Sequence, residues 1–156
     1  MLRVIVVSNT SPLNYLILID RVGILPTLFQ TVVAPETVAR ELAHERAPDP
    51  VRAWIANPTA WLDILSPKAP DSGIALGVGE RDAICLALEL SATLLLLDDK
   101  AARRVAKERG LRVAGTPGIL ELASRNALVN LPSAVAALER TSYRIRADVV
   151  RKILKE

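Results

Sequence analysis

The sequence predicts an α/β protein with a mainly parallel sheet of four to five strands and helices on both faces. Short apolar runs of strand length alternate along the chain with longer stretches of helical character. This alternation is typical of strand–helix–strand units, whose consecutive strands lie parallel. Because 156 residues is the usual length of one domain, we expect residues 1–156 to form a single three-layer α/β/α sandwich.

Five apolar runs are the candidate strands. They span residues 3–7, 31–34, 61–65, 93–97 and 111–114. The fourth run contains four consecutive leucines after Thr93, which is the pattern of a strand that is buried on both faces.

Helices are expected between and after these runs. They span residues 12–18, 22–29 with an interruption at Pro26, 35–45, 51–56, 79–90, 100–109, 118–124, 132–138 and 146–154. Pro35 is compatible with the first turn of its helix, and Gly110 suits the position that follows a helix end. The proline-containing stretch 66–73 is the longest predicted loop, and it is too short to link two domains.

Composition excludes several classes of protein. Cys85 is the only cysteine, so an internal disulfide is excluded and a reducing compartment is indicated. No run reaches the roughly 18 apolar residues of a membrane helix, and no signal-peptide pattern is present, so we expect a cytoplasmic protein without a membrane partner. Aromatic residues make up only 3% of the chain, which argues against an aromatic platform for stacking bases.

The charge balance favours an anionic partner. The formal net charge is +3, and 15 of the 20 basic residues are arginine. Arginine suits bidentate phosphate contacts, and a basic surface beside an acidic cleft suits a nucleic-acid substrate. The alternative is an ordinary solvated surface that is rich in arginine.

Acidic and polar residues follow two of the predicted strands. Asp98 and Asp99 come directly after the leucine run, and Ser8–Ser11 follows the first strand. In an open parallel sheet, ligands bind outside the carboxyl ends of the strands. The pattern therefore predicts a cation site at this edge, although one of the two aspartates is equally suited to cap the helix that starts near Lys100.

A second acidic cluster opens the helix over 79–90. Glu80 shares one side of this helix with Ala83, Ile84 and Ala87, and a carboxylate at the head of a buried stripe is costly unless it is paired or metal-bound. Asp82 lies on a more mixed face. We therefore favour Glu80 over Asp82 as a ligand, with Asp82 still a candidate, and note that stabilisation of the helix dipole also explains an acid at position 80.

Glu41 and Asn9 complete the candidate set. Glu41 lies one turn into the helix after the second strand, where it either points toward the cleft or is an exposed acid near Arg40. The amide oxygen of Asn9 is a suitable ligand for a hard cation, and its alternative role is that of a turn residue after a strand. Because His44 is the only histidine, a zinc site has no ligand set, and the implied metal is Mg²⁺ or Mn²⁺.

Four segments in order resemble a PIN domain of the VapC-like toxin branch of prokaryotic nucleic-acid-binding proteins. They are Val7–Leu13, Val33–Leu42, Gly79–Ala87 and Leu96–Gly118. The resemblance covers residues 3 to about 125. It implies an α/β/α sandwich in which three or four acids bind Mg²⁺ or Mn²⁺ and cleave RNA, so the expected activity is that of a metal-dependent endoribonuclease toxin.

The resemblance also implies a role for each matching residue. Asn9 falls where many PIN nucleases have their first aspartate, Glu41 matches the second acid, and Glu80, or else Asp82, matches the third. Asp98 or Asp99 matches the fourth acid. Asn9 removes one negative charge, so two functions stay open: a nuclease with a weakened metal site, and a catalytically weak module that binds nucleic acid or protein.

Further residues are expected to contact the substrate. The resemblance implies that Ser11 and Thr116 supply hydroxyl groups near the metal or the phosphate. Arg103 and Arg104, in the basic segment 103–109, are candidates for contacts with the RNA backbone. Such contacts would position the RNA without reading its sequence.

The C-terminal region predicts an amphipathic helix over about residues 144–155. Its apolar positions are Ile145, Val149, Val150 and Ile153. This face either docks on the sheet of the same chain or contributes to a dimer, and the resemblance implies a homodimer and a small antitoxin protein as partners. A receiver-like signalling domain is disfavoured, because its acid pair would follow the first strand rather than the fourth.

Overall fold

The computed structural model describes residues 4–57 and 59–154. Five parallel strands form one sheet in the order β3-β2-β1-β4-β5. The strands are β1 (Val6–Ser8), β2 (Val32–Pro35), β3 (Leu62–Leu65), β4 (Leu94–Leu96) and β5 (Val113–Ala114). This arrangement confirms the predicted parallel sheet; the predicted start of the first strand, at residue 3, lies outside the described residues.

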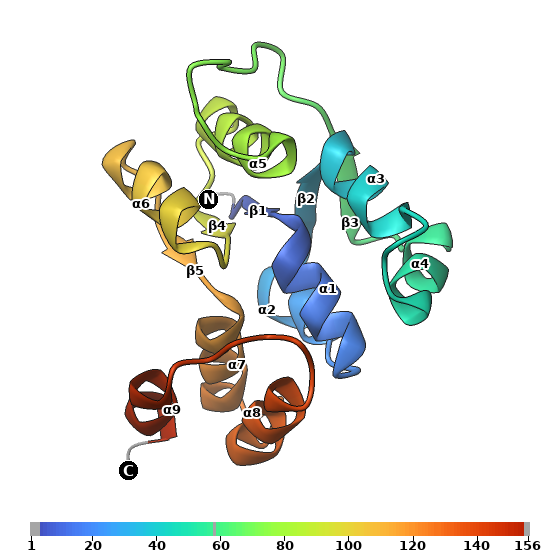
Figure 1. The fold of residues 1–156 in the computed structure, drawn as a ribbon, viewed down its shortest axis with the longest axis vertical. Coiled ribbons are helices and arrows are strands. Elements are labelled where there is room, and N and C mark those ends of the chain that lie inside the picture. The colour runs from blue at the N-terminus through green and yellow to red at the C-terminus, as the bar shows by residue number, and fades with distance from the viewer. Residues whose placement is uncertain (1–3, 58, 155–156) are drawn as a thin grey trace.

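Helices follow every strand, as predicted from the alternating pattern (Figure 1). They are α1 (Thr10–Leu18), α2 (Ile24–Phe29), α3 (Glu36–Ala43), α4 (Asp49–Ala56), α5 (Val78–Glu89), α6 (Lys100–Glu108), α7 (Thr116–Arg125), α8 (Leu131–Glu139) and α9 (Ala147–Leu154). Within the part of the chain that is described, none of these helices is long and apolar enough to cross a membrane.

The sheet separates two apolar clusters, which makes the fold a three-layer α/β/α sandwich. Val6, Val32 and Leu96 face the cluster formed with α1, α2, α3, α4, α7 and α8. Their neighbours Val7 and Leu95 face the opposite cluster, which α5 and α6 complete. Because successive side chains of a strand point to opposite faces, each short strand contributes to both cores.

The strand order places a topological switch point at the centre of the sheet. From β1 the chain continues outward to β2 and β3, and then crosses back to β4 and β5 on the other side of β1. The carboxyl ends of β1 and β4 therefore lie side by side, with their following loops leading in opposite directions. In open parallel sheets this crevice is the usual ligand site.

Proline positions account for the differences from the predicted helices. Pro26 does not interrupt α2, because it lies in the first turn, where the missing N–H has no partner within the helix. The helices after β1 and β5 begin two residues earlier than predicted, at Thr10 and Thr116, with Pro12 and Pro117 inside their first turns. We expected these helices to begin only at Pro12 and Gly118, which was too late.

The C-terminal amphipathic helix forms as α9 and packs against α8. Its apolar side chains Val149, Val150 and Ile153 are half-buried, and none of its residues is fully buried. The expected docking on the sheet was wrong, because α9 packs on a neighbouring helix, with part of its apolar face still open. The helix begins at Ala147, so the predicted start at residue 144 was too early and Ile145 precedes it; the predicted end at residue 155 lies outside the described residues.

The central position of β4 yields a prediction about stability. Leu96 is 0% exposed, whereas Leu88, on the outer side of α5, is 37% exposed. We expect Leu96→Ala to lower the free energy of unfolding by about 3 kcal/mol, because it leaves a cavity, and Leu88→Ala to lower it by less than about 1 kcal/mol. Urea denaturation monitored by circular dichroism measures both; similar losses for the two variants would contradict the assignment of the core.

Candidate functional site

Asn9 lies at the switch point and joins the ends of the two central strands. Its backbone N–H donates to the carbonyl of Leu96 at 2.9 Å, and the residue is the N-cap of α1. Its side chain is only 5% exposed, and its Oδ1 has no hydrogen-bond partner among the described residues. A buried amide oxygen without a donor is costly, so this position is suited to a water molecule or a cation.

Glu41 reaches the same place from α3. Its Oε2 accepts a hydrogen bond from Thr10 Oγ1 at 2.9 Å. Its carboxylate also packs so closely against Gly79 that a Cβ at that position would collide with Oε1. Gly79 thus leaves room for the Glu41 carboxylate where α3 approaches α5, and a Cβ there would force that side chain to move.

Glu80 points into the crevice from the first turn of α5. Burial, followed by the negative charge of Asp99, raises the pKa of the Glu80 carboxyl above its ordinary value; a backbone hydrogen bond at Gly77 opposes this effect, and the charge of Glu41 adds to it. Asp99 and Glu41 are therefore each close enough to Glu80 to disfavour its negative charge. Together with Asn9, both Glu41 and Glu80 line a cavity of about 380 Å³.

Asp99 combines two of the roles considered for the acid pair. Its Oδ2 accepts a hydrogen bond from the backbone N–H of Ala102 at 2.9 Å, which makes it the N-cap of α6. The residue is exposed, and its charge reaches Glu80. The capping interaction fixes the orientation of the carboxylate at the edge of the crevice.

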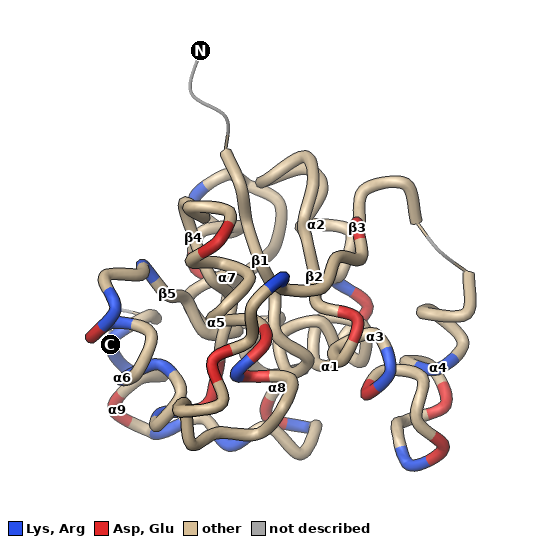
Figure 2. The backbone as a smooth tube through the Cα atoms, turned by 90° about the horizontal axis from the view of Figure 1, so that it is seen from above, with Lys and Arg blue, Asp and Glu red and all other residues tan. Residues whose placement is uncertain are grey.

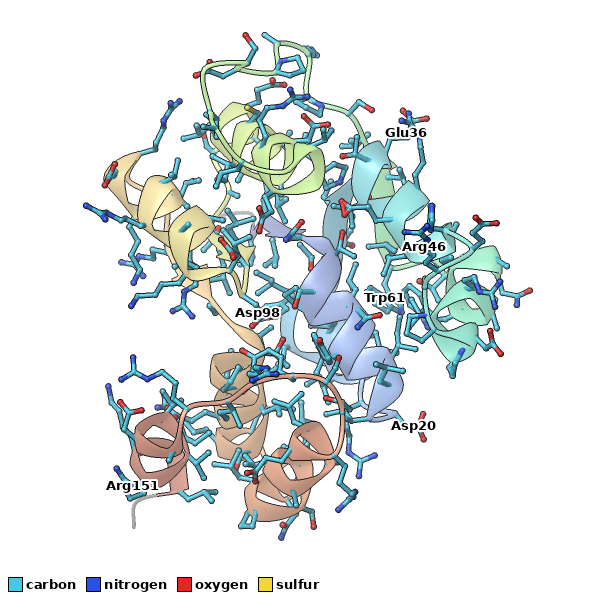
Figure 3. The ribbon with its side chains drawn as sticks, viewed as in Figure 1. Asp20, Glu36, Arg46, Trp61, Asp98 and Arg151 are labelled. Carbon is cyan, nitrogen blue, oxygen red and sulfur yellow. The ribbon has the colours of Figure 1, made fainter. Side chains whose placement is uncertain are left out.

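Asp98, by contrast, is fully engaged by neighbouring groups (Figure 3). It accepts hydrogen bonds from Ser11 Oγ, Thr116 N and Thr116 Oγ1, each at 2.7 Å, and from Tyr143 OH at 2.8 Å. An ionised carboxylate offers about four lone-pair sites. Asp98 thus connects α1, the start of α7 and the segment before α9.

Asp82 lies in a different environment from the other candidate acids. It is 6% exposed, and it accepts hydrogen bonds from Thr37 Oγ1 at 3.1 Å and from the guanidinium of its neighbour Arg81 at 3.1 and 3.2 Å. We expected Asp82 on a more mixed face and Glu80 at the head of a buried stripe, but Asp82 is buried and Glu80 is half-buried. Since α3 packs across that face, Asp82 connects α5 to α3 and does not line the cavity.

The remaining predicted contacts are divided between the site and the surface. Ser11 and Thr116 direct their hydroxyl groups to Asp98. The half-buried Arg103 lies beside Asp98, since a Cβ on Gly115 would meet both side chains. Arg104 is exposed and pairs with Glu108 at 3.3 Å. Figure 2 shows lysine and arginine along α6 and around α9.

The role of Tyr143 was not predicted from the sequence. Its hydroxyl donates to Asp98, and its ring packs edge-to-face on Tyr15 with centroids 5.0 Å apart. Burial and the negative charge of Asp98 raise the pKa of the Tyr143 hydroxyl, so it stays protonated as a donor. Tyr143 and Asp98 are 45 positions apart in the sequence, so only the folded chain reveals their contact.

The donor set of the crevice fits a hard cation. All the groups are oxygens: the unpartnered Oδ1 of Asn9 and the carboxylates of Glu41, Glu80 and Asp99. A cation would relieve both the repulsion at Glu80 and the unsatisfied amide oxygen. Among the described residues, 4–57 and 59–154, no three or more His, Cys, Asp or Glu side chains are grouped so that they could hold a metal ion.

Comparisons with known proteins support the fold. A PilT N-terminus domain protein, SSO1118, from the hyperthermophilic archaeon Sulfolobus solfataricus P2 has a similar structure, with a TM-score of 0.51 and 19% sequence identity. The alignment covers 90% of this chain and 99% of that protein. At this identity the likeness shows the fold alone. A search of curated proteins gives no match.

The sequence itself matches a family. The model of the family DUF3368, described as a PIN domain, matches residues 5–156. This range includes all five strands and every candidate residue of the crevice. The chain therefore belongs to the PIN-domain family, whose members are generally nucleases that use divalent metal ions.

Proposed function

We propose that this protein is a Mg²⁺- or Mn²⁺-dependent endoribonuclease. The observation that carries the proposal is the crowding of Glu80 by Asp99 and Glu41 beside the unpartnered oxygen of Asn9. Folding brings like charges together, which raises the free energy of the folded state, and a bound cation would lower it again. The position at the switch point of a parallel sheet supports the same function.

Each residue has a distinct part in this proposal. Asn9, Glu80 and Asp99 would hold the cation, and Glu41, oriented by Thr10, would complete its oxygen environment. A divalent cation there supplies neutralisation of the phosphate charge and activation of water for hydrolysis. Asp98 is a positioning residue, because its four hydrogen bonds hold the loop that carries Asp99.

The RNA backbone would lie along the basic surface next to the crevice. The candidates are Arg103 and Arg104 on α6, together with arginine and lysine residues on α9 (Figure 2). Contacts of this kind hold the phosphates and carry no sequence information.

A second function, a nucleic-acid- or protein-binding module with weak catalysis, is favoured by specific observations. Position 9 carries a neutral amide, so the crevice has one negative charge fewer than a site with aspartate there. Asp98, one of the predicted ligands, is already engaged by four donors. Metal binding distinguishes this function from that of a nuclease.

We further propose that the enzyme acts as the toxin of a toxin–antitoxin pair and forms a homodimer. The half-buried apolar side chains of α9 support an interface at this helix, either with a second copy or with a small antitoxin protein. Burial of such a face would add to the contact that α9 already makes with α8.

The first prediction of this proposal concerns the acids of the crevice. We expect Glu80→Gln and Asp99→Asn each to lower Mn²⁺-dependent cleavage of a fluorescent single-stranded RNA on the order of 100-fold, because each removes a charged ligand. The matched control is Asp82→Asn, which should lower the unfolding midpoint and retain cleavage. Cleavage that persists in EDTA, or that survives both crevice variants, would exclude the proposal.

A second prediction follows from the raised pKa of Glu80. Protons and the cation compete for this carboxylate, so the affinity for Mn²⁺ should increase as pH rises through a range above that of an ordinary glutamate. Calorimetric titration with Mn²⁺ between pH 5 and 8, on the order of five points, measures the slope. The slope should decrease in Glu80→Gln; an unchanged slope would show that Glu80 does not bind the ion.

The third prediction concerns Asn9. Asn9→Asp should tighten Mn²⁺ binding by at least about tenfold, because a carboxylate adds a full negative charge next to the cation. The same change should destabilise the metal-free protein through repulsion with the neighbouring acids. Thermal denaturation with and without Mn²⁺ tests both effects. If the variant gains no affinity, position 9 is not part of the metal site.

A further inference from the structure

A second cavity adjoins the acidic crevice. It has a volume of about 410 Å³ and lies between α1, the C-terminal end of α3 and residues 44–48. The two cavities share Thr10, Asn14 and Glu41. The two cavities are therefore neighbours, and the hydrogen-bonded pair Thr10 and Glu41 belongs to the wall that they share. We call the second cavity the side pocket.

The side pocket has an apolar floor and a basic rim. Leu42, which is 1% exposed, contributes to the floor together with Ala47 and Pro48. Arg40 and Arg46 belong to the rim. The crevice thus carries only carboxylates, whereas the side pocket adds the two guanidinium groups to the Glu41 carboxylate that both cavities share.

The rim groups are available to a ligand. The contact of Arg40 with Glu36 is 3.6 Å long, and both side chains are more than half exposed, so it is a weak pair. Arg46 takes part in none of the ion pairs found between described residues. The backbone N–H of Arg46 donates to His44 Nδ1 at 3.0 Å, so the neutral imidazole carries its proton on Nε2 as a further donor.

We propose that the side pocket binds one nucleotide of a single-stranded RNA, next to the phosphate held at the crevice. The base would lie on the apolar floor, and its phosphate would contact Arg40 and Arg46. A volume of about 400 Å³ is in the range of small-ligand pockets. This inference rests on the proposed function, because it takes the scissile phosphate of the same strand to occupy the crevice.

The apolar floor distinguishes a nucleotide from a simple anion. An inorganic phosphate would use the arginines alone and leave Leu42, Ala47 and Pro48 unused. Asn14 lies where the two cavities meet, and its amide offers both a donor and an acceptor. Such a group can read a base edge or a ribose 2′-hydroxyl, so Asn14 is the candidate for nucleotide preference.

The test is a titration of the ¹⁵N-labelled full chain with AMP, GMP, CMP and UMP, followed by amide chemical shifts in EDTA. We expect shifts at the backbone amides of residues 42–47, and roughly five- to tenfold weaker binding in Arg46→Ala, because a charge-assisted contact is lost. Arg21→Ala is the matched control. It removes the same charge from the turn between α1 and α2, where Arg21 contacts the carbonyl of Asp20, and should leave binding unchanged.

Inorganic phosphate is the probe that separates the two ligand classes. If phosphate alone gives the same shifts and affinity as the nucleotides, or if the shifts occur only on α6, the inference is wrong. Loss of binding in Arg21→Ala equal to that in Arg46→Ala would also overturn it, since it would indicate a general charge effect.

Cleavage kinetics separate this inference from the nuclease proposal. With a short RNA and Mn²⁺, Arg46→Ala should raise KM with little change in kcat, as expected when binding is lost equally from the ground and transition states. If Arg46→Ala has a normal KM and the nucleotides cause no amide chemical-shift changes, the nucleotide-binding inference is wrong and the nuclease proposal is unaffected. Nucleotide shifts at residues 42–47 without cleavage by any metal would support the pocket and contradict the nuclease.

Discussion

The arrangement of the site depends on the hydrogen bonding of Asp98. A carboxylate at the end of a buried strand needs compensation for its lost hydration. Here α1, the start of α7 and the segment before α9 each supply donors, and the guanidinium of Arg103 lies nearby. Hydrogen bonds to a charged group are stronger than neutral ones. Asp98 thus holds together three parts of the chain that are distant in sequence, and it fixes the loop from which Asp99 projects.

In the neighbouring crevice, the electrostatic environment of Glu80 is the opposite of that of Asp98. Glu80 is partly buried near two other negative charges, and it takes part in none of the ion pairs found between described residues. Gly79 leaves room for the Glu41 carboxylate next to α5, and a larger residue would force that side chain to move. A neutral side chain at position 9 limits the total charge, yet it leaves one buried oxygen without a donor. Such uncompensated groups at a switch point are typical of a functional site, because stability alone would not select them.

Acidic and basic side chains occupy separate parts of the surface around the crevice. Acids gather where the central strands end, whereas arginines lie along α6 and about the end of α3. A polyanionic strand would be attracted to the basic flanks and repelled by the bare crevice until a cation is present. Under the proposed function, metal and nucleic acid would therefore each strengthen the binding of the other. Use of divalent metal ions is general in the PIN-domain family.

The sequence by itself determined the five strands, the parallel sheet and the placement of Asn9, Asp98 and Asp99 at one edge, because apolar periodicity and the alternation of strands and helices are encoded locally. It did not determine how Asp98 and Asp99 divide their roles, since both follow the same strand. Nor did it reveal that Asp82 bonds to Thr37 or that Tyr143 reaches Asp98. Helix phase gives the direction of a side chain relative to its own axis. Only packing between elements decides which partner stands in that direction.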